Sequence, residues 1–389
     1  MDFSPTIEVK HGYIYVAAAA PESAPTTRYA YYLYEKGQGL VEKRRYSDCA
    51  TCLFRPFSPG SYYVKVFVRA PSSDPNGGYD ISTARTGKVS VPGKNTTPSI
   101  YPTISLRYEE LDDLVIPPRK SIIYNIAWNG VHYEFLIRHK PESTQALVLG
   151  TGAVGEHPRP YFARNSWAAE FPCTAIYYSD PTSYMGECHL GWGYGTNQRW
   201  YLEDIAILTL RILRKLKIQP EDTLFYGSSG GGFTSMLLAS MFHSRATVIN
   251  PQFIIENYWK SLVNQMKAAC LKEGETLIPQ RTHVVHFFQE TGYIPSLHII
   301  QNLYSERDIL LQVTPFLSEL TKSGLSVKNH FGLEFYTKEG GHNAMPDKSV
   351  CLKHILEDLT LPIASAPYEV HAADAGFLSR FLSELHKSK

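Results

Sequence analysis

The sequence lacks an excess of charge of either sign and has no long hydrophobic run. Its 389 residues include 38 lysines and arginines against 37 aspartates and glutamates, which gives no strong field to hold a nucleic acid or an anionic membrane. No stretch of about 18 apolar residues is present, and residues 1–10 show no cationic segment followed by an apolar one. We therefore expect a cytoplasmic protein with no transmembrane segment and no nucleic-acid partner.

Cysteine is too scarce for a disulfide framework. The six cysteines are spread along the chain, and only Cys49 and Cys52 have the C-x-x-C spacing typical of a zinc or redox site. Neither a second pair nor a nearby histidine completes such a site. We expect reduced, structural thiols at these positions.

The length and composition predict two domains. A chain with 43% hydrophobic and 19% charged residues can bury one large core and a smaller one. Before residue 100, strand-like runs alternate with clusters of Pro, Gly, Ser and Asn, and helical periodicity is lacking. This pattern predicts a small β-sandwich over residues 1–100, with a turn and strand at 59–68 that resemble an immunoglobulin-like module. Strands are expected at 6–18, 28–34, 50–57, 61–69 and 87–91.

Tyrosine is frequent in these expected strands, and it has two interpretations. Aromatic rings stack on sugar rings, yet they are also favoured in strands for packing alone. We favour packing, and a carbohydrate- or protein-binding role for the first domain stays open.

Residues 92–102 are rich in Pro, Thr, Asn and Ser and predict a linker, after which the pattern changes. Two expected strands flank Asn129-Gly130, a dipeptide typical of a tight hairpin. Strands and helices then alternate, which predicts a mostly parallel sheet with helices on both faces over 101–389. A hairpin before such a sheet is the layout of the α/β-hydrolase fold. Strands are expected at 121–128, 132–138, 146–149, 174–178, 223–226, 246–249, 296–302 and 332–337, and helices at 164–171, 198–216 and 284–294.

Residues 223–239 predict a strand, a glycine-rich turn and a helix. Gly227-Ser228-Ser229-Gly230-Gly231 fits the G-x-S-x-G spacing of a nucleophile elbow with Ser229 at its centre. The backbone of such a strained turn packs closely on its neighbours, so the residues two before and two after must lack a bulky side chain. A phosphate-binding turn is the alternative, but no lysine follows the glycines as a P-loop requires. We predict that Ser229 is a catalytic nucleophile.

Two further segments fit the chemistry of a serine hydrolase. The small residues at 150–155 follow the strand at 146–149, where one amide of an oxyanion hole is expected; Gly152 or Ala153 would supply it and Gly230 the other. His342 lies in a glycine-containing loop after the last expected strand, the position of the general base.

The acid of the expected triad has two candidates. Glu306 and Asp308 both follow the strand at 296–302, and either carboxylate could orient the imidazole of His342. We prefer Glu306, and the alternative that both are solvated and the acid lies elsewhere stays open.

Several segments give the chain a resemblance to a known family. With the elbow, they resemble bacterial α/β-hydrolase-like proteins associated with capsular polysaccharide synthesis. They are similar, more distantly, to the carbohydrate O-acetyltransferase of accessory secretion systems that export glycosylated adhesins. The resemblance covers about residues 145–345. The segments are 160–167, 178–184 with Ser179-Asp180-Pro181-Thr182, 191–195, Asn250-Pro251-Gln252 and Gly340-Gly341-His342-Asn343.

The resemblance implies acyl chemistry on a sugar: a serine esterase or O-acetyltransferase that needs no metal or organic cofactor. Trp192 and Tyr194 would form a sugar platform or pack a lid, and Asp180 is a candidate substrate contact. Other polysaccharide-biosynthesis proteins are the partners that it suggests. A catalytically silent scaffold in a polysaccharide or glycoprotein export assembly is the alternative function, and whether water or a sugar hydroxyl accepts the acyl group stays open.

Overall fold

The computed structural model describes residues 3–10, 13–18, 26–54, 56, 60–72, 78–91, 101–155, 157, 159–363 and 378–387. The chain divides into two compact units, Met1–Tyr108 with Asn125–His132, and Glu109–Tyr124 with Tyr133–Lys389. Residues 92–100 of the predicted linker, 11 and 12 of the predicted strand at 6–18, and 55 and 57 of the predicted strand at 50–57 lie outside the described residues. Within the described ranges, no helix has both the length and the hydropathy of a membrane span.

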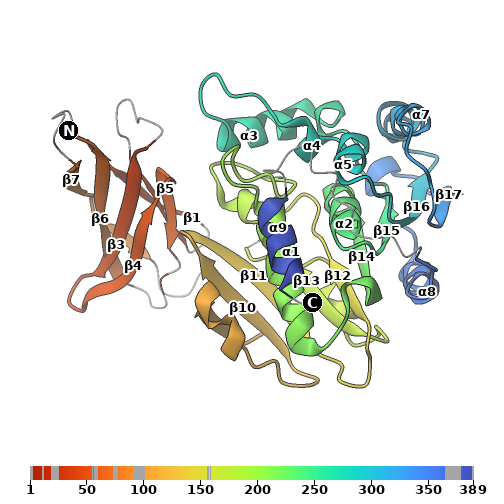
Figure 1. Ribbon diagram of the computed structural model, residues 1–389, viewed down its shortest axis with the longest axis horizontal. Coiled ribbons are helices and arrows are strands. Elements are labelled where there is room, and N and C mark those ends of the chain that lie inside the picture. The colour runs from red at the N-terminus through yellow and green to blue at the C-terminus, as the bar shows by residue number, and fades with distance from the viewer. Residues whose placement is uncertain are drawn as a thin grey trace. The chain divides into compact units, whose positions relative to one another are not determined.

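The strands of the first unit up to β8 form two antiparallel sheets (Figure 1). Alternate residues along its longest strand, β6, are buried, as expected for a sheet with one face on a core. Buried residues of β2, β3, β5 and β6 form one core, so the two sheets share it. An all-β unit is therefore present, and its immunoglobulin-like character stays a prediction. One sheet has the order β1 (Thr6–Lys10), β2 (Tyr13–Ala17), β5 (Thr51–Phe54); the other has β4 (Gly39–Ser47), β3 (Arg28–Glu35), β6 (Gly60–Pro71), β7 (Tyr79–Arg85), with β8 (Val89–Val91) paired to β6.

Neither β4 nor β7 is predicted by the sequence pattern. Both strands carry mostly exposed, polar side chains, so they lack the apolar alternation that marks a strand. Half-buried tyrosines on the outer face of this sheet contact each other and a cation. The rings of Tyr34 and Tyr63 stack at 5.0 Å, and the Arg85 guanidinium lies 3.8 Å from the centre of the Tyr63 ring. Cys49 and Cys52 are free thiols, and burial raises the pKa of Cys52 to about 12.

Nine strands form the large sheet, in the order β17-β16-β15-β14-β12-β13-β11-β10-β9. Adjacent strands from β13 through β12 to β17 are parallel, and β11 joins β13 antiparallel. β12, β13 and β14 are buried almost throughout, as parallel strands covered on both faces must be. The bounds are β9 (Thr103–Arg107), β10 (Ser121–Trp128), β11 (Val131–Arg138), β12 (Ala146–Leu149), β13 (Thr174–Tyr178), β14 (Thr223–Ser228), β15 (Arg245–Ile249), β16 (Ser296–Asn302) and β17 (Phe331–Tyr336).

The helices pack on this sheet and on each other. All twelve residues of α2 are buried, and α2 contacts β14, β15, α1 and α5. The last described helix, α9, lies along α1 (Figure 1), where Arg214 pairs with Glu384 at 2.7 Å. The helices are α1 (Tyr201–Leu216), α2 (Gly230–Met241), α3 (Lys260–Cys270), α4 (Pro279–Thr282), α5 (Val284–Thr291), α6 (Glu306–Asp308), α7 (Thr314–Lys322), α8 (Lys348–Asp358) and α9 (Ser379–His386).

The helix predicted at 164–171 is wrong. Only a short 3-10 turn, Asn165–Trp167, forms there. Arg164 has φ 61°, a left-handed conformation that no residue within a right-handed α-helix adopts, and Pro172 disfavours a helical conformation at Phe171.

Candidate active site

Ser229 lies at the turn between β14 and α2. Its backbone has φ 55° and ψ −126°, outside the regions that an L-residue ordinarily occupies. A Cβ on Gly227 would overlap the carbonyl oxygen of Gly231, and a Cβ on Gly231 would lie 2.7 Å from the carbonyl oxygen of Gly150. Space therefore requires glycine two residues before and two residues after the serine.

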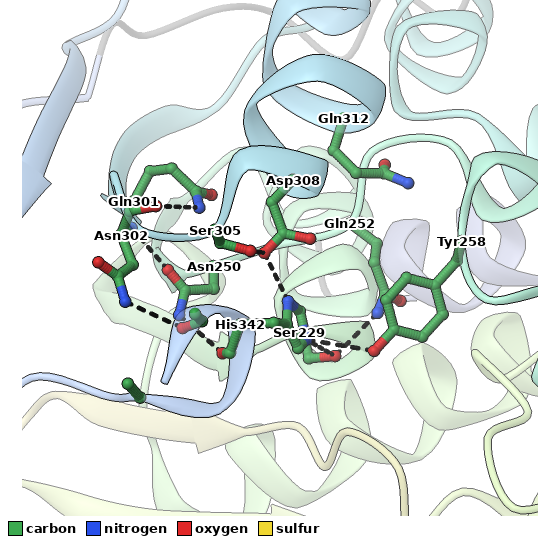
Figure 2. A network of polar contacts seen from close by, with 12 residues as sticks. Ser229, Asn250, Gln252, Tyr258, Gln301, Asn302, Ser305, Asp308, Gln312 and His342 are labelled. Atoms are coloured by element: carbon green, nitrogen blue, oxygen red, sulfur yellow. Dashed lines mark hydrogen bonds and ion pairs between the residues drawn. The ribbon is translucent and has the colours of Figure 1, made fainter. Parts of the chain in front are cut away.

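Three side chains that follow β14, β16 and β17 meet at this turn (Figure 2). His342 Nε2 lies 2.9 Å from Ser229 Oγ, and Asp308 Oδ2 lies 2.6 Å from His342 Nδ1. An ionised carboxylate only accepts hydrogen bonds, so Nδ1 carries the proton and Nε2 presents its lone pair to the serine hydroxyl. Asp308 also accepts a hydrogen bond from the Ser305 hydroxyl at 2.6 Å. The side chains of Asp308 and His342 are only 3% and 13% exposed, so water screens their interaction little.

The carboxylate at His342 belongs to Asp308, so the preference for Glu306 is wrong. Both residues lie in α6, where Glu306 is exposed and Asp308 is buried. Residues two apart on a helical turn point about 200° away from each other, so only one of the two can face the imidazole.

The loop after β12 closes on the elbow. A Cβ on Gly152 would lie 3.2 Å from the carbonyl oxygen of Ser228, 3.5 Å from Ser229 Cβ and 3.9 Å from the Gly230 nitrogen, so Gly152 contacts the turn itself. Ala153, the next residue, is exposed. Gly230 is the first residue of α2, and the first amides of a helix have no partner within it. The predicted oxyanion-hole segments therefore lie beside one serine side chain.

A glutamine outside the expected triad also contacts Ser229. Gln252 Nε2 donates to Ser229 Oγ at 2.8 Å, and Trp192 Nε1 donates to Gln252 Oε1 at 2.5 Å. Because an indole N–H can only donate, it fixes the amide with its oxygen toward Trp192 and its NH₂ group toward Ser229. Gln252 is fully buried. The sequence resemblance includes Asn250-Pro251-Gln252 but assigns these residues no role.

Tyr258 completes the group around the serine. Its hydroxyl lies 3.2 Å from His342 Nε2, and its ring meets the Trp192 ring at 88° with centroids 6.1 Å apart. Burial raises the pKa of Tyr258, and the charge of Asp308 raises it further, whereas hydrogen bonding with Ser229 works in the other direction. The side chain therefore stays a neutral phenol. No motif in the sequence points to this residue.

Two buried asparagines hold the loops that carry His342 and Asp308 (Figure 2). Asn250 Nδ2 donates to the carbonyl oxygen of His342 at 2.9 Å, and its Oδ1 accepts from the Asn302 nitrogen at 2.8 Å. Asn302 Nδ2 donates to the carbonyl oxygens of Lys338 and Gly341 at 2.7 and 2.9 Å. The amides tie the loop after β17 to the ends of β15 and β16.

Trp192, Tyr194 and Asp180 do not form an open sugar-binding surface. Trp192 and Tyr194 are 1% and 0% exposed, so they fit the alternative of packing a lid. The Asp180 carboxylate accepts hydrogen bonds from the backbone N–H groups of Thr182 at 2.8 Å and of Gly193 at 2.9 Å. These bonds hold the segment 181–195 together. This segment also reaches the elbow, because a Cβ on Gly230 would lie 3.2 Å from Trp192 Nε1.

An exposed aromatic ring follows Tyr258 directly in the chain. Trp259 is 50% exposed, and the Arg307 guanidinium lies 4.6 Å from its ring centre. Arg307 is fixed by donating to the carbonyl oxygens of Asn257 and Tyr258 at 3.2 and 3.1 Å. The exposed apolar side chains Leu303, Tyr304, Leu310 and Leu311 come from the neighbouring segment around α6.

The strand order, the antiparallel hairpin that opens the sheet and the serine turn after β14 define an α/β-hydrolase fold. Similar solved structures include the capsule O-acetyltransferase of Neisseria meningitidis serogroup A, with 14% identity, a TM-score of 0.42, and coverage of 59% of this chain and 93% of that one. A carboxyl esterase from Tuber melanosporum matches at 12% identity and a TM-score of 0.45, over 62% and 87%.

The Gap123 glycosylation-associated complex from Streptococcus agalactiae matches at 12% identity and a TM-score of 0.46, over 92% of this chain and 69% of that one. Likenesses this weak say nothing of substrate or partner. No protein-family model and no curated protein matches the sequence.

Proposed function

We propose that this protein is a serine esterase or acyltransferase in which Ser229 is the nucleophile, His342 the general base and Asp308 the orienting acid. The observation that carries this proposal is the hydrogen-bonded series from Ser229 Oγ through His342 to Asp308, at 2.9 and 2.6 Å, on a strained turn. Strain in a non-glycine backbone costs on the order of 1–3 kcal/mol, and it persists where function requires the geometry.

The proposed reaction begins when Ser229 Oγ attacks the acyl carbonyl and its proton passes to His342 Nε2. The π electrons of the carbonyl move to its oxygen. The resulting oxyanion accepts hydrogen bonds from the backbone N–H groups of Gly230 and of Gly152 or Ala153. Collapse of this intermediate breaks the ester bond, and His342 returns the proton to the leaving alkoxide. The acyl-serine then passes its acyl group to water or to a second hydroxyl, with His342 again taking and returning one proton.

We propose a carbohydrate ester as the substrate, on the basis of the sequence resemblance. Trp259 takes the place of Trp192 as the proposed stacking surface, since it is half exposed and follows Tyr258, whose hydroxyl reaches His342. Trp259→Ala should raise KM for an acetylated oligosaccharide by about three- to ten-fold, as expected for loss of one stacking contact, and leave KM for p-nitrophenyl acetate unchanged. Leu310→Ala, which removes an exposed apolar side chain from the neighbouring segment, is the matched control.

We further propose that a sugar hydroxyl competes with water for the acyl-serine. The mostly buried segment 181–195 packs on the elbow through Trp192, and such a cover limits water at the serine. With an acetyl donor present, a polysaccharide acceptor should accelerate turnover and gain acetyl groups detectable by mass spectrometry. Release of free acetate alone, at a rate that no acceptor changes, would leave a plain esterase.

The general proposal is tested with an excess of p-nitrophenyl acetate, followed before the steady state is reached. We expect a burst of p-nitrophenol of one equivalent per chain and a mass increase of one acetyl group on the peptide that contains Ser229. Folded protein that gives neither result would be the catalytically silent scaffold.

A further inference from the structure

A second group of titratable side chains lies on β16, β17 and α8, apart from Ser229. His298, Glu334 and His354 each bring one nitrogen or oxygen atom to within 4.8 Å of the others. His298 Nε2 lies 3.4 Å from Glu334 Oε2, and His354 Nε2 lies 3.6 Å from Glu334 Oε1. The two imidazole planes cross at 82° with centroids 4.9 Å apart, so in-plane lone pairs of the two rings can converge on one point.

His354 is the feature of this group that hydrogen bonding leaves unexplained. Its side chain is 8% exposed, and within the described part of the chain neither ring nitrogen has a hydrogen-bond partner. Buried polar atoms in folded proteins are nearly always satisfied. The closest oppositely charged atom to Nε2 is the Glu334 oxygen at 3.6 Å, beyond hydrogen-bonding distance but suited to two ligands of one ion.

His298 is oriented as a metal-binding histidine usually is. Its Nδ1 lies 2.8 Å from Asp358 Oδ2, and the same oxygen accepts the Thr247 hydroxyl at 2.6 Å. A carboxylate on one ring nitrogen fixes the tautomer and leaves the other nitrogen to the metal. Nε2 of His298 therefore faces Glu334.

We propose that His298, Glu334 and His354 bind a divalent transition-metal ion, for which Zn²⁺ is the best fit. Two imidazoles and one carboxylate are a zinc ligand set that leaves a fourth position for water. Bonds of about 2.0–2.1 Å in a tetrahedron hold ligand atoms about 3.3–3.4 Å apart. His298 Nε2 lies 3.4 Å from one oxygen of the Glu334 carboxylate and His354 Nε2 lies 3.6 Å from the other, so this carboxylate is near ligand spacing from both imidazoles. The Glu334 side chain is 47% exposed, which gives an ion a way in.

The same three residue types meet at His283, His286 and Glu319, and this second group is the contrast. Its imidazole rings are stacked, with planes 20° apart and centroids 4.1 Å apart, so their lone pairs run nearly parallel instead of converging. His283 Nε2 and Glu319 Oε2 are 2.8 Å apart, a direct contact that is shorter than the spacing of two ligands of one ion. The ligand types match and the geometry does not.

The ion would be structural. β17 is the edge strand of the large sheet, and the ion would join it to β16 and α8. β16 leads to Asp308 and β17 leads to His342, so the ion would brace the strands before both residues without touching the reacting atoms.

A protonated His298 is the alternative occupant. Burial lowers the pKa of His298, but the hydrogen bond and charge of Asp358 and the charge of Glu334 raise it more, and the net direction is upward. An imidazolium between two carboxylates would account for His298 and leave His354 without a partner.

The test is a zinc titration of chelator-treated, full-length protein, with bound metal measured by elemental analysis after gel filtration. We expect the wild type to bind one Zn²⁺ per chain. In Glu334→Gln and in His354→Ala the dissociation constant for zinc should rise by about 100-fold or more. His283→Ala removes a histidine from the contrasting group and should leave the stoichiometry and affinity unchanged. Glu334 is half exposed, so its amide variant should fold, which circular dichroism checks.

Retention of no zinc by the wild type, equal affinity in Glu334→Gln, or loss of the ion in His283→Ala would each overturn the proposal. Co²⁺ in place of zinc should give an intense visible band typical of four-coordinate nitrogen and oxygen ligation, absent from Glu334→Gln. Ser229→Ala should bind zinc as the wild type does, so this site can fail without the proposed acyl chemistry failing, and the reverse.

Discussion

Two histidine–aspartate pairs lie near the edge of the large sheet, with His298 on β16, His342 in the loop after β17, Asp308 on α6 and Asp358 at the end of α8. His342 Nδ1 is 2.6 Å from Asp308, and His298 Nδ1 is 2.8 Å from Asp358. The pairs differ at the other ring nitrogen, which faces the Ser229 hydroxyl in one and the Glu334 carboxylate in the other. A carboxylate on Nδ1 prepares an imidazole equally for proton transfer and for metal binding, so the group that faces Nε2 decides which follows.

The two pairs also differ in what holds the ring. His342 lies in a loop after β17, to which the side chains of Asn250 and Asn302 donate hydrogen bonds. His298, in contrast, is the third residue of β16. A loop can move an imidazole between the serine and a leaving group, but a central strand position keeps it fixed. The first arrangement suits catalysis and the second suits a structural ion.

Removal of the Ser229 hydroxyl, which faces His342 Nε2, should have the largest effect on ester turnover. Ser229→Ala should lower ester turnover by on the order of 10⁴-fold or more, because the proposed nucleophile is lost. Ser228→Ala is the matched control, since it removes the neighbouring hydroxyl, which accepts a hydrogen bond from Arg164 at 3.1 Å. Steady-state kinetics with p-nitrophenyl acetate measure both, and equal rates in the two variants would remove Ser229 from the mechanism.

Replacement of the carboxylate on His342 should have the next largest effect. Asp308→Asn should reduce turnover by about 10³- to 10⁴-fold, because an amide in that place favours the wrong tautomer and stabilises no imidazolium. Glu306→Gln, two residues earlier on an exposed side chain, should keep its rate within two-fold. If Asp308→Asn keeps the wild-type rate while His342→Ala does not, another group orients the imidazole.

The corresponding change at the second pair should leave catalysis intact. Asp358→Asn should weaken zinc binding by about 10- to 100-fold, the usual effect of losing an outer partner of a ligating histidine. Ester turnover should stay within two-fold of the wild type. A loss of turnover in the folded variant, at saturating zinc, would show that the two pairs are coupled.

Gln252 should have the smallest effect on turnover among the changed side chains around Ser229. Gln252→Ala removes one hydrogen bond to Ser229 Oγ, worth about 1 kcal/mol, so turnover should fall about five- to ten-fold through kcat. Gln289→Ala, at an exposed glutamine on α5, is the control. An unchanged kcat would mean that the contact of Trp192 and Gln252 serves packing alone.

The elements around Ser229 were predictable from the sequence, because each of them depends on residues that are adjacent in the chain. The strand at Thr223–Ser228, the glycines around Ser229 and the helix after it follow from steric limits on one turn. β12, β13 and β16 have the bounds that their apolar runs predict. The position of His342 follows from the order of elements.

The rest depends on contacts between distant segments. Asp308 and Glu306 follow the same strand, and only the rotation of α6 separates them. Gln252 and Tyr258 reach the serine because the chain after β15 folds back over it. The contact of His298, Glu334 and His354 joins two strands and a helix, and no spacing in the sequence predicts it.

Covalent labelling with a fluorophosphonate, followed by peptide mapping, tests the assignment of Ser229 most directly. We predict one adduct per chain, on Ser229, formed more slowly in Asp308→Asn and at the wild-type rate in Glu306→Gln. An adduct on another residue, or none on folded wild-type protein, would contradict the assignment.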